Sequence, residues 1–370
     1  MSEEWYKIAN EDAVASPAVL LYPNRIRENI QRMVAIAGDP GRLRPHVKTH
    51  KLPELIRMQL EAGIGRFKCA TLSEAAMVAE CGATDILIAY PLYGPAIDRL
   101  FDLITAYPEV RFSALCDNEE QRMAFEHTAK ARGKHLGIFI DLNVGMDRTG
   151  IVPGAEAIAL YRALADSPFL SPRGLHIYDG HLNMADPEQR ATESAACFQA
   201  VQSMIDELGQ NNLVPEELVC GGTPTFPIHA KYPERTLSPG TLLLWDWNYA
   251  FKFADLSFLH AAILLTRVVS KPAKNKLCLD LGHKAVASEM TPPRVHLLGI
   301  PLYEHILHSE EHLVVSFDGA EAYSAGDCLY GVPAHICPTM ALHEKVWTVA
   351  DGQAAEKWHV KARSREVSIL

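Results

Sequence analysis

The chain has 370 residues, of which 48% are hydrophobic and 22% are charged, a composition typical of a globular protein with a sizeable core. Its formal net charge of −10 argues against nucleic acid or an anionic membrane as a partner. The N-terminus has no apolar signal segment, no run reaches the roughly 18 apolar residues of a membrane helix, and the eight cysteines form no CxxC pair, so we expect a soluble cytoplasmic protein with reduced thiols.

Short apolar runs alternate with helix-like runs over residues 16–236. The strand-like runs lie at 18–23, 43–49, 66–72, 85–91, 111–117, 136–142, 173–180 and 217–222. This alternation predicts right-handed βαβ units and a parallel sheet. Eight such units favour a closed (β/α)8 TIM-type barrel over an open sheet. The first strand also has no GxGxxG segment after it, which argues against a dinucleotide-binding fold.

The pattern changes after residue 236. From there the chain consists of short strand-like runs, such as HAAILLTRVV and KLCLDLG, broken by Gly, Pro, Asp and Asn. This pattern predicts an all-β domain over residues 237–370, with which we group residues 1–15.

The segment RPHVKTHK places basic or imidazole side chains on alternate residues, namely Arg44, His46, Lys48 and His50. In an extended strand alternate residues face the same way, so these four would form one cationic face that handles a ligand. Lys48 would then lie at the barrel mouth, where a lysine among other cations can attack a carbonyl or form a Schiff base. A phosphate-binding or salt-bridged lysine is the alternative, and Lys51 is a weaker candidate because it is out of phase.

The segment CGGTPT follows the last predicted barrel strand, where phosphate sites of such barrels are common. Gly221 and Gly222 permit close approach of backbone N–H groups to an anion, and Thr223 adds a hydroxyl donor. A plain tight turn is the alternative reading.

Polar residues follow two further predicted strands. Arg148 lies in the glycine-bounded loop of DLNVGMDRTG, where a fixed cation could meet a phenolate or carboxylate. In HIYDGHL, His176 and Tyr178 share one strand face, and His181 follows at the mouth. Tyr178 could pack beside a flat ring, and His181 could act as a general base.

In the predicted β domain, the segment PAHICPT carries His335 and Cys337 two residues apart. In a strand both would point the same way and offer one nitrogen and one sulfur ligand to a metal with open positions. A chance HxC pair is the alternative, because the pattern is short.

The segments RPHVKTHK, CATLSEA, GMDRTG, CGGTPT, LSPGT, LDLGHKAV and PAHICPT, in this order, resemble those of the fold-type III pyridoxal phosphate enzymes. Within that group the chain resembles the D-threonine aldolase and D-serine dehydratase branch. The resemblance covers nearly the whole chain and implies an alanine-racemase-like barrel with pyridoxal 5'-phosphate joined to Lys48. It also implies a divalent metal, Zn or Mn, on His335 and Cys337. The implied cofactor-binding residues besides Lys48 are His46, Arg148, Tyr178, Gly221, Gly222 and Thr223.

The resemblance implies a homodimer that acts on a D-β-hydroxy amino acid. Retro-aldol cleavage to glycine and an aldehyde is the first expectation, and β-elimination to a keto acid and ammonia is the second. Family aldolases often have an aspartate where this chain has Cys337, whereas dehydratases have cysteine. An amino-acid racemase and a non-catalytic cofactor carrier are further alternatives, but neither has a use for the metal ligands.

Overall fold

The structure is a computed structural model that describes residues 4–300 and 302–366. Within these residues the chain forms two compact units. The barrel unit comprises residues 31–48, 55–240 and 364–366, and the β unit comprises residues 4–30, 49–54 and 241–363. Among the described helices none is both long and apolar enough to cross a membrane.

The barrel unit contains a curled sheet of seven parallel strands in sequential order. They are β2 (Arg66–Cys69), β3 (Asp85–Ile88), β4 (Arg111–Cys116), β5 (Leu136–Leu142), β6 (Leu170–Ile177), β7 (Glu217–Cys220) and β8 (Arg235–Leu237). Two isolated parallel bridges, Leu43 with Leu237 and His46 with Lys68, place the segment from 43 to 46 between the edge strands β8 and β2. The predicted alanine-racemase-like barrel with a C-terminal β domain is therefore confirmed.

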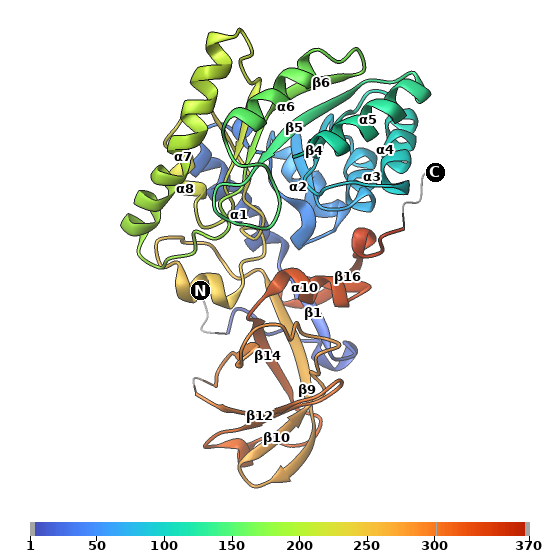
Figure 1. Ribbon diagram of the computed structural model, residues 1–370. Helices are drawn as coiled ribbons and strands as arrows, with labels where there is room; N and C mark the ends of the chain where they lie inside the picture. Colours follow the sequence, from blue (N-terminus) through green and yellow to red (C-terminus); the bar gives the residue numbers. More distant parts are fainter. Residues whose placement is uncertain (1–3, 301, 367–370) are drawn as a thin grey trace. The chain divides into compact units, whose positions relative to one another are not determined.

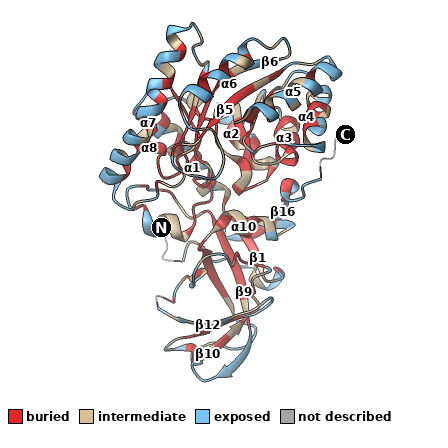
Figure 2. Cartoon of the chain, in the orientation of Figure 1, coloured by how far each residue is buried: buried red, intermediate tan, exposed pale blue. Residues whose placement is uncertain are grey.

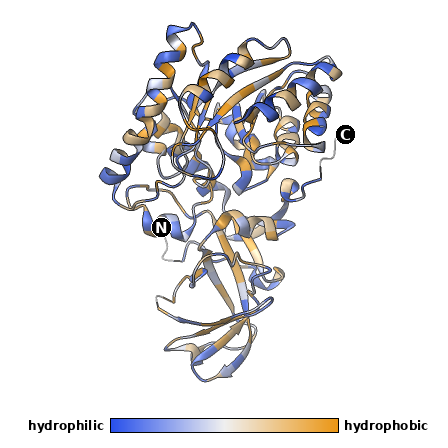
Figure 3. Ribbon diagram, viewed as in Figure 1, coloured by the Kyte–Doolittle hydropathy of each residue, from blue (hydrophilic) through white to orange (hydrophobic). Residues whose placement is uncertain are grey.

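Helices cover the outer face of this sheet (Figure 1). They are α2 (Pro53–Glu61), α3 (Leu72–Glu80), α4 (Pro95–Ala106), α5 (Glu119–Arg132), α6 (Ala155–Ala165), α7 (Pro187–Gln210) and α8 (Phe226–His229). Side-chain N-caps fix several starts: the Thr71 hydroxyl accepts from the Glu74 N–H, and the Asn118 side chain accepts from the Gln121 N–H. Figure 2 shows the strands buried and the outer helix faces exposed, and Figure 3 shows the matching apolar and polar colouring.

The β unit contains a nine-stranded sheet in which every pairing is antiparallel except that of β1 with β15. Strand β9 pairs with β1, β10 and β14. The strands are β1 (Ala18–Leu21), β9 (Ala262–Ala273), β10 (Lys276–Leu279), β11 (Val295–Leu297), β12 (Glu304–His308), β13 (Leu313–Ser316), β14 (Cys328–Pro333), β15 (Lys345–Ala350) and β16 (Gln353–His359). The remaining helices are α1 (Pro23–Ala37), α9 (Trp247–Lys252) and α10 (Ile336–Leu342), and the short 3-10 turns are η1 (Glu11–Ala13), η2 (Pro40–Arg42), η3 (Val47–Thr49), η4 (Ala320–Ala322) and η5 (Lys361–Arg363).

The barrel sheet differs from the predicted one in its first and last strands. The predicted first barrel strand, 18–23, forms β1 of the β unit, where it pairs with β9 and β15. The predicted eighth strand is β7, and β8 at Arg235–Leu237 was missed because only three residues pair. All four residues of β1 are buried, and a fully buried apolar run indicates a strand without indicating which sheet it joins.

The segment RPHVKTHK is not a regular strand, so its predicted single cationic face is wrong. After the bridge at His46 the chain turns through η3 (Val47–Thr49), which breaks the alternation. Arg44 is fully buried in an ion network, and the buried His50 belongs to the β unit. Only His46 and Lys48 of the four side chains line the cavity described below.

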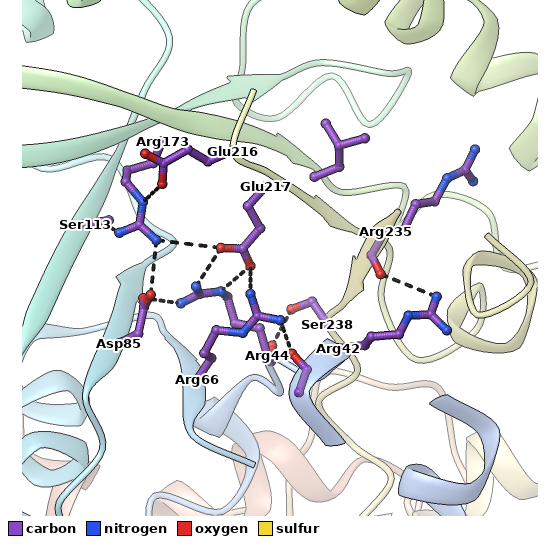
Figure 4. A network of polar contacts seen from close by, with 12 residues as sticks. Arg42, Arg44, Arg66, Asp85, Ser113, Arg173, Glu216, Glu217, Arg235 and Ser238 are labelled. Carbon is purple, nitrogen blue, oxygen red and sulfur yellow. Dashed lines mark hydrogen bonds and ion pairs between the residues drawn. The ribbon is translucent and has the colours of Figure 1, made fainter. Parts of the chain in front are cut away.

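The ion network lies at the amino ends of the barrel strands (Figure 4). The Arg44 guanidinium donates to Glu217 at 2.9 and 2.8 Å and to Asp85 at 2.8 Å. Arg173 contacts Asp85 at 3.1 Å, and Arg66 contacts Glu217 at 3.2 Å. Asp85 and Glu217 are the first residues of β3 and β7, so the network ties opposite parts of the sheet together at the end that serves stability in such barrels.

Candidate active site

A cavity of about 530 Å³ lies in the barrel unit and receives side chains from the carboxyl-terminal parts of its strands. This is the end of a (β/α)8 barrel that carries active sites. The structure brings together four of the predicted site residues, His46, Lys48, Arg148 and Tyr178, in the cavity wall.

A wider hollow of about 930 Å³ in the β unit has different chemistry. Its lining includes Asn275, Tyr303, Phe317 and Asp318, but no lysine, arginine, histidine or cysteine among the described residues. It therefore offers no amine for a Schiff base and no cation for an anionic ligand, and the smaller cavity is the candidate active site.

Lys48 owes its place to a turn that closes around His46. The His46 N–H donates to the Pro239 carbonyl at 2.8 Å, and its ring Nδ1 accepts from the Lys48 N–H at 3.3 Å. These bonds fix the backbone on both sides of Val47, which is fully buried. The half-buried Lys48 amine is thus held in the cavity wall by a rigid backbone.

A chain of polar side chains not predicted from the sequence crosses the cavity wall. The Lys68 Nζ lies 3.3 Å from the His176 Nε2, and the His176 Nδ1 lies 2.7 Å from the Asp141 Oδ1. Thr149 donates to the other oxygen of Asp141 at 2.8 Å. The sequence signal for this chain is a lysine inside the apolar run RFKCATL, and the strand pattern places His176 on one face with Tyr178 without indicating its other partners.

Burial and neighbouring charge shift the pKa values in this chain. Burial, then the positive charge of Lys48, lowers the pKa of Lys68 to about 7. Burial, then the charge of Lys68, lowers the pKa of His176. For Asp141 burial opposes ionisation, but the hydrogen bond from His176 outweighs it and lowers the pKa. The cavity wall therefore holds a neutral imidazole and an amine with a pKa near 7, and the ionised Asp141 carboxylate lies behind the imidazole.

Tyr178 presents an aromatic face to the same cavity. Its ring lies nearly parallel to that of His176, with centroids 6.5 Å apart and an interplanar angle of 12°. The Arg148 guanidinium carbon lies 5.2 Å from the Tyr178 centroid, and the Lys68 Nζ lies 5.6 Å from it. Two cations around an aromatic face suit a flat anionic ligand.

The loop carrying Gly221 and Gly222 lies beside Tyr178, although its residues are not among those that line the cavity. A Cβ on Gly222 would come within 3.0 Å of the Tyr178 ring. Gly221 has φ +72°, and a Cβ there would lie 2.6 Å from the His229 ring. Thr223 accepts from the Gly240 N–H at 3.1 Å. Gly221 is therefore required by its backbone conformation and by space, and Gly222 leaves little room for a side chain beside Tyr178. The loop could bring backbone N–H groups close to a phosphate.

His181 lies apart from these residues and is not in the cavity wall. Its Nε2 lies 3.7 Å from the Cys197 sulfur, and its Nδ1 is buried without a hydrogen-bond partner in the described part of the chain. Its role as general base stays a prediction.

His335 and Cys337 lie at the start of α10 in the β unit, which corrects the predicted strand. Strand β14 ends at Pro333, His335 is the N-cap residue, and Cys337 is the second residue of the helix. The His335 Nδ1 lies 2.5 Å from the Glu289 Oε1, and the Cys337 sulfur lies 3.1 Å from the Thr49 Oγ1. The helical turn, rather than strand alternation, brings the imidazole and the thiol together.

The two side chains shift each other's pKa values in opposite directions. Burial lowers the pKa of His335, but hydrogen bonding and attraction to Cys337 and Glu289 outweigh burial and raise the pKa to about 9. Burial raises the pKa of Cys337, and the hydrogen bond from His335 outweighs it, so the net shift is downward. Within the described residues no three His, Cys, Asp or Glu side chains form a group able to hold a metal ion. The donors present fit a site with two protein ligands in which water or substrate supplies the others.

Comparisons with known proteins cover most of the chain. The family model for "Alanine racemase, N-terminal domain" matches residues 22–246, and one for a serine dehydratase domain matches residues 261–349. The chain is 29% identical to D-threonine aldolase of Arthrobacter sp over 356 residues, which cover 95% of this chain and 93% of that protein. It is 28% identical to 3-hydroxy-D-aspartate aldolase of Paracoccus denitrificans (strain Pd 1222), with 96% and 94% covered. The crystal structure of D-threonine aldolase from Filomicrobium marinum superposes with a TM-score of 0.89 at 26% identity, covering 96% of this chain and 98% of the other.

Proposed function

The chain belongs to the alanine racemase N-terminal domain family and is a pyridoxal phosphate-dependent lyase, and on that premise we propose that it cleaves D-β-hydroxy amino acids by a retro-aldol reaction. The observation that carries the proposal is Lys48, an amine in a cavity whose wall also holds Arg148 and the face of Tyr178. The similarity to two aldolases of D-amino acids supports the substrate class.

The residues present fit the cofactor. Lys48 supplies the amine that holds its aldehyde carbon, Tyr178 supplies a flat face, and Gly221 and Gly222 leave the space that a Cβ would fill beside a phosphate. When bound, pyridoxal phosphate supplies an electron sink for the bond that breaks at Cα. In the proposed reaction Lys48 would hold the cofactor and provide an amine that can move a proton, and Arg148 would hold an anionic oxygen of the ligand.

β-Elimination is the second candidate reaction, and two observations favour it. Cys337 stands where family aldolases often have an aspartate, and the β unit matches a serine dehydratase domain model. The two reactions differ in the first proton removed: from the β-hydroxyl for retro-aldol cleavage, and from Cα for elimination of hydroxide.

One assay separates them. Purified protein loaded with pyridoxal phosphate and a divalent metal is incubated with D-threonine and, in parallel, with D-serine. We expect acetaldehyde and glycine from D-threonine, with the L-enantiomers as controls. Keto acid and ammonia without aldehyde would assign the dehydratase reaction instead, and interconversion of D- and L-enantiomers alone would assign a racemase.

We further propose that His335 and Cys337 hold a divalent metal, Zn or Mn, whose chemistry would be Lewis-acid activation of the substrate hydroxyl. A thiolate and an imidazole favour a borderline-soft ion such as zinc over magnesium. Chelation, or Cys337→Ala, is expected to lower turnover at least about 10²-fold while the absorption of the bound cofactor is kept. Full activity after complete removal of divalent metal would contradict the site. Cys278→Ala, at a half-buried thiol of β10, is the matched control.

A further inference from the structure

Lys68 is a buried amine that the proposed reaction does not use. It is the third residue of β2, the residue is 2% exposed, and it lines the same cavity as Lys48. Lysine is seldom fully buried unless another group stabilises its charge. We therefore looked for a group in the cavity that would stabilise the charge of Lys68.

The hydrogen bonds around His176 fix which way Lys68 donates. The Asp141 carboxylate can only accept, so the proton of the 2.7 Å contact lies on the His176 Nδ1. The downward-shifted pKa of His176 leaves the ring neutral at neutral pH, and its Nε2 then accepts from Lys68 at 3.3 Å. By this assignment one hydrogen of the Lys68 ammonium is engaged and two are available to the cavity.

The charges around Lys68 do not balance within the protein. Burial is the largest influence that lowers its pKa, the charge of Lys48 is second, and Asp141 opposes them. The charged or titratable groups that face it from the packed elements are Lys48, Arg44, Asp141, Asp179 and His176. Since Asp141 is already bonded to His176 and Thr149, an oxyanion in the cavity would complete the surroundings of Lys68.

The cofactor carries such an oxyanion beside the nitrogen of Lys48. Pyridoxal phosphate is attached through its aldehyde carbon, and the adjacent ring carbon bears an ionisable oxygen. We infer that the Lys68 ammonium, held by His176 and Asp141, binds this ring oxygen and is a cofactor-binding residue of the site. The inference rests on the proposed attachment of the cofactor to Lys48. Bound to the oxyanion, Lys68 stays charged at neutral pH because a neighbouring negative charge raises the pKa of an amine.

The test uses Lys68→Met, which keeps the length of the side chain and removes the charge, and Lys68→Arg, which restores a charged donor. In the methionine variant we expect cofactor binding to weaken about 10- to 100-fold, the effect of losing a hydrogen bond to a charged group. The visible band of the bound cofactor should remain, but its pH midpoint should rise by about one unit, because removing a nearby cation favours the protonated form of the cofactor nitrogen attached to Lys48. The arginine variant should restore part of both properties.

Lys130→Met, the same change at an exposed position of α5, is the control and should alter neither property. Unchanged affinity and midpoint in Lys68→Met would overturn the inference while leaving the role of Lys48 intact. A lower thermal stability of the cofactor-free protein with an unchanged midpoint would also overturn it, because that is a purely structural effect. Loss of the visible band in Lys68→Met together with its retention in Lys48→Ala would identify Lys68 as the attachment point and overturn both proposals.

Discussion

Lys48→Ala is expected to abolish the visible absorption of the bound cofactor and to reduce turnover at least about 10³-fold. If Lys48 has the role proposed above, the variant removes both the amine that holds the cofactor and a group that can move a proton at Cα, and loss of acid–base catalysis alone costs about 10²- to 10⁴-fold. The fold should survive, because Lys48 is half-buried and lies in the cavity wall rather than in the packed core. Absorption spectra of the purified variant, with and without added pyridoxal phosphate, measure the first effect, and release of acetaldehyde from D-threonine measures the second.

Two other lysines test the assignment. Lys51→Asn is a control outside the cavity wall, chosen because Lys51 has φ +54° and asparagine tolerates that conformation. It should keep both the absorption and the turnover. Lys68 is the stricter rival because it lines the same cavity. If the band survives in Lys48→Ala and disappears in either of the other variants, Lys48 is not the attachment point.

The fold class could be predicted from the sequence, but the closure of the barrel could not. Strands β2 to β7 lie where the apolar runs indicated, because each run is followed by an amphipathic helix. The segment from 18 to 21 has the same local pattern as a barrel strand but pairs with β9 about 240 residues later. Register with a distant strand leaves no local trace in an apolar run. The three residues of β8 are too few to give a period.

In the candidate site, too, the sequence pattern shows local structure but not contacts between distant segments. His46, Lys48, Arg148 and Tyr178 could be predicted because each follows or ends a strand, and barrels gather such residues at one end. Lys68 was missed because it lies inside an apolar run, and only the barrel interior shows that it meets His176 from another strand. Arg44 was wrongly predicted to face a ligand. Its charge suggested a ligand, whereas its partners are Asp85 and Glu217, which are 41 and 173 residues away along the chain.

Arg44→Met is expected to be the most destabilising single change outside the cavity, at about 3–5 kcal/mol of unfolding free energy. Arg44 is fully buried and bonds to both Asp85 and Glu217, so its removal leaves the buried Glu217 carboxylate and the half-buried Asp85 carboxylate with fewer donors. Arg66 still contacts Glu217, and Arg173 still contacts both Asp85 and Glu217, which favours the lower end of this range.

Tryptophan fluorescence and far-UV circular dichroism together show which unit the Arg44→Met substitution destabilises. All five tryptophans lie outside the segments that form the barrel unit, so their fluorescence reports on the β unit, while far-UV circular dichroism also follows the barrel helices. In urea, the dichroism transition of Arg44→Met should move to lower concentration. Arg132→Met, which breaks an exposed pair with Asp98 and Asp102, is the matched control and should give no measurable shift.

The pH dependence of the unfolding free energy shows whether Arg44→Met destabilises the protein through lost charge interactions or through lost packing. Burial raises the pKa of Asp85 and of Glu217, but the charge and hydrogen bonds of Arg44 outweigh burial, so both are lowered in the folded protein. A depressed carboxyl pKa contributes stability that is present above the unfolded value, near 4, and is lost as the pH falls through the folded value. The stability difference between the wild-type protein and Arg44→Met should therefore stay nearly constant from pH 7 to about pH 4 and narrow as the pH falls below about 4. Adding Asp85→Asn and Glu217→Gln should recover much of the loss at pH 7, because no buried carboxylate is then left unpaired. A difference that stays constant with pH and is not relieved in the triple variant would assign the effect to lost packing of the Arg44 side chain instead.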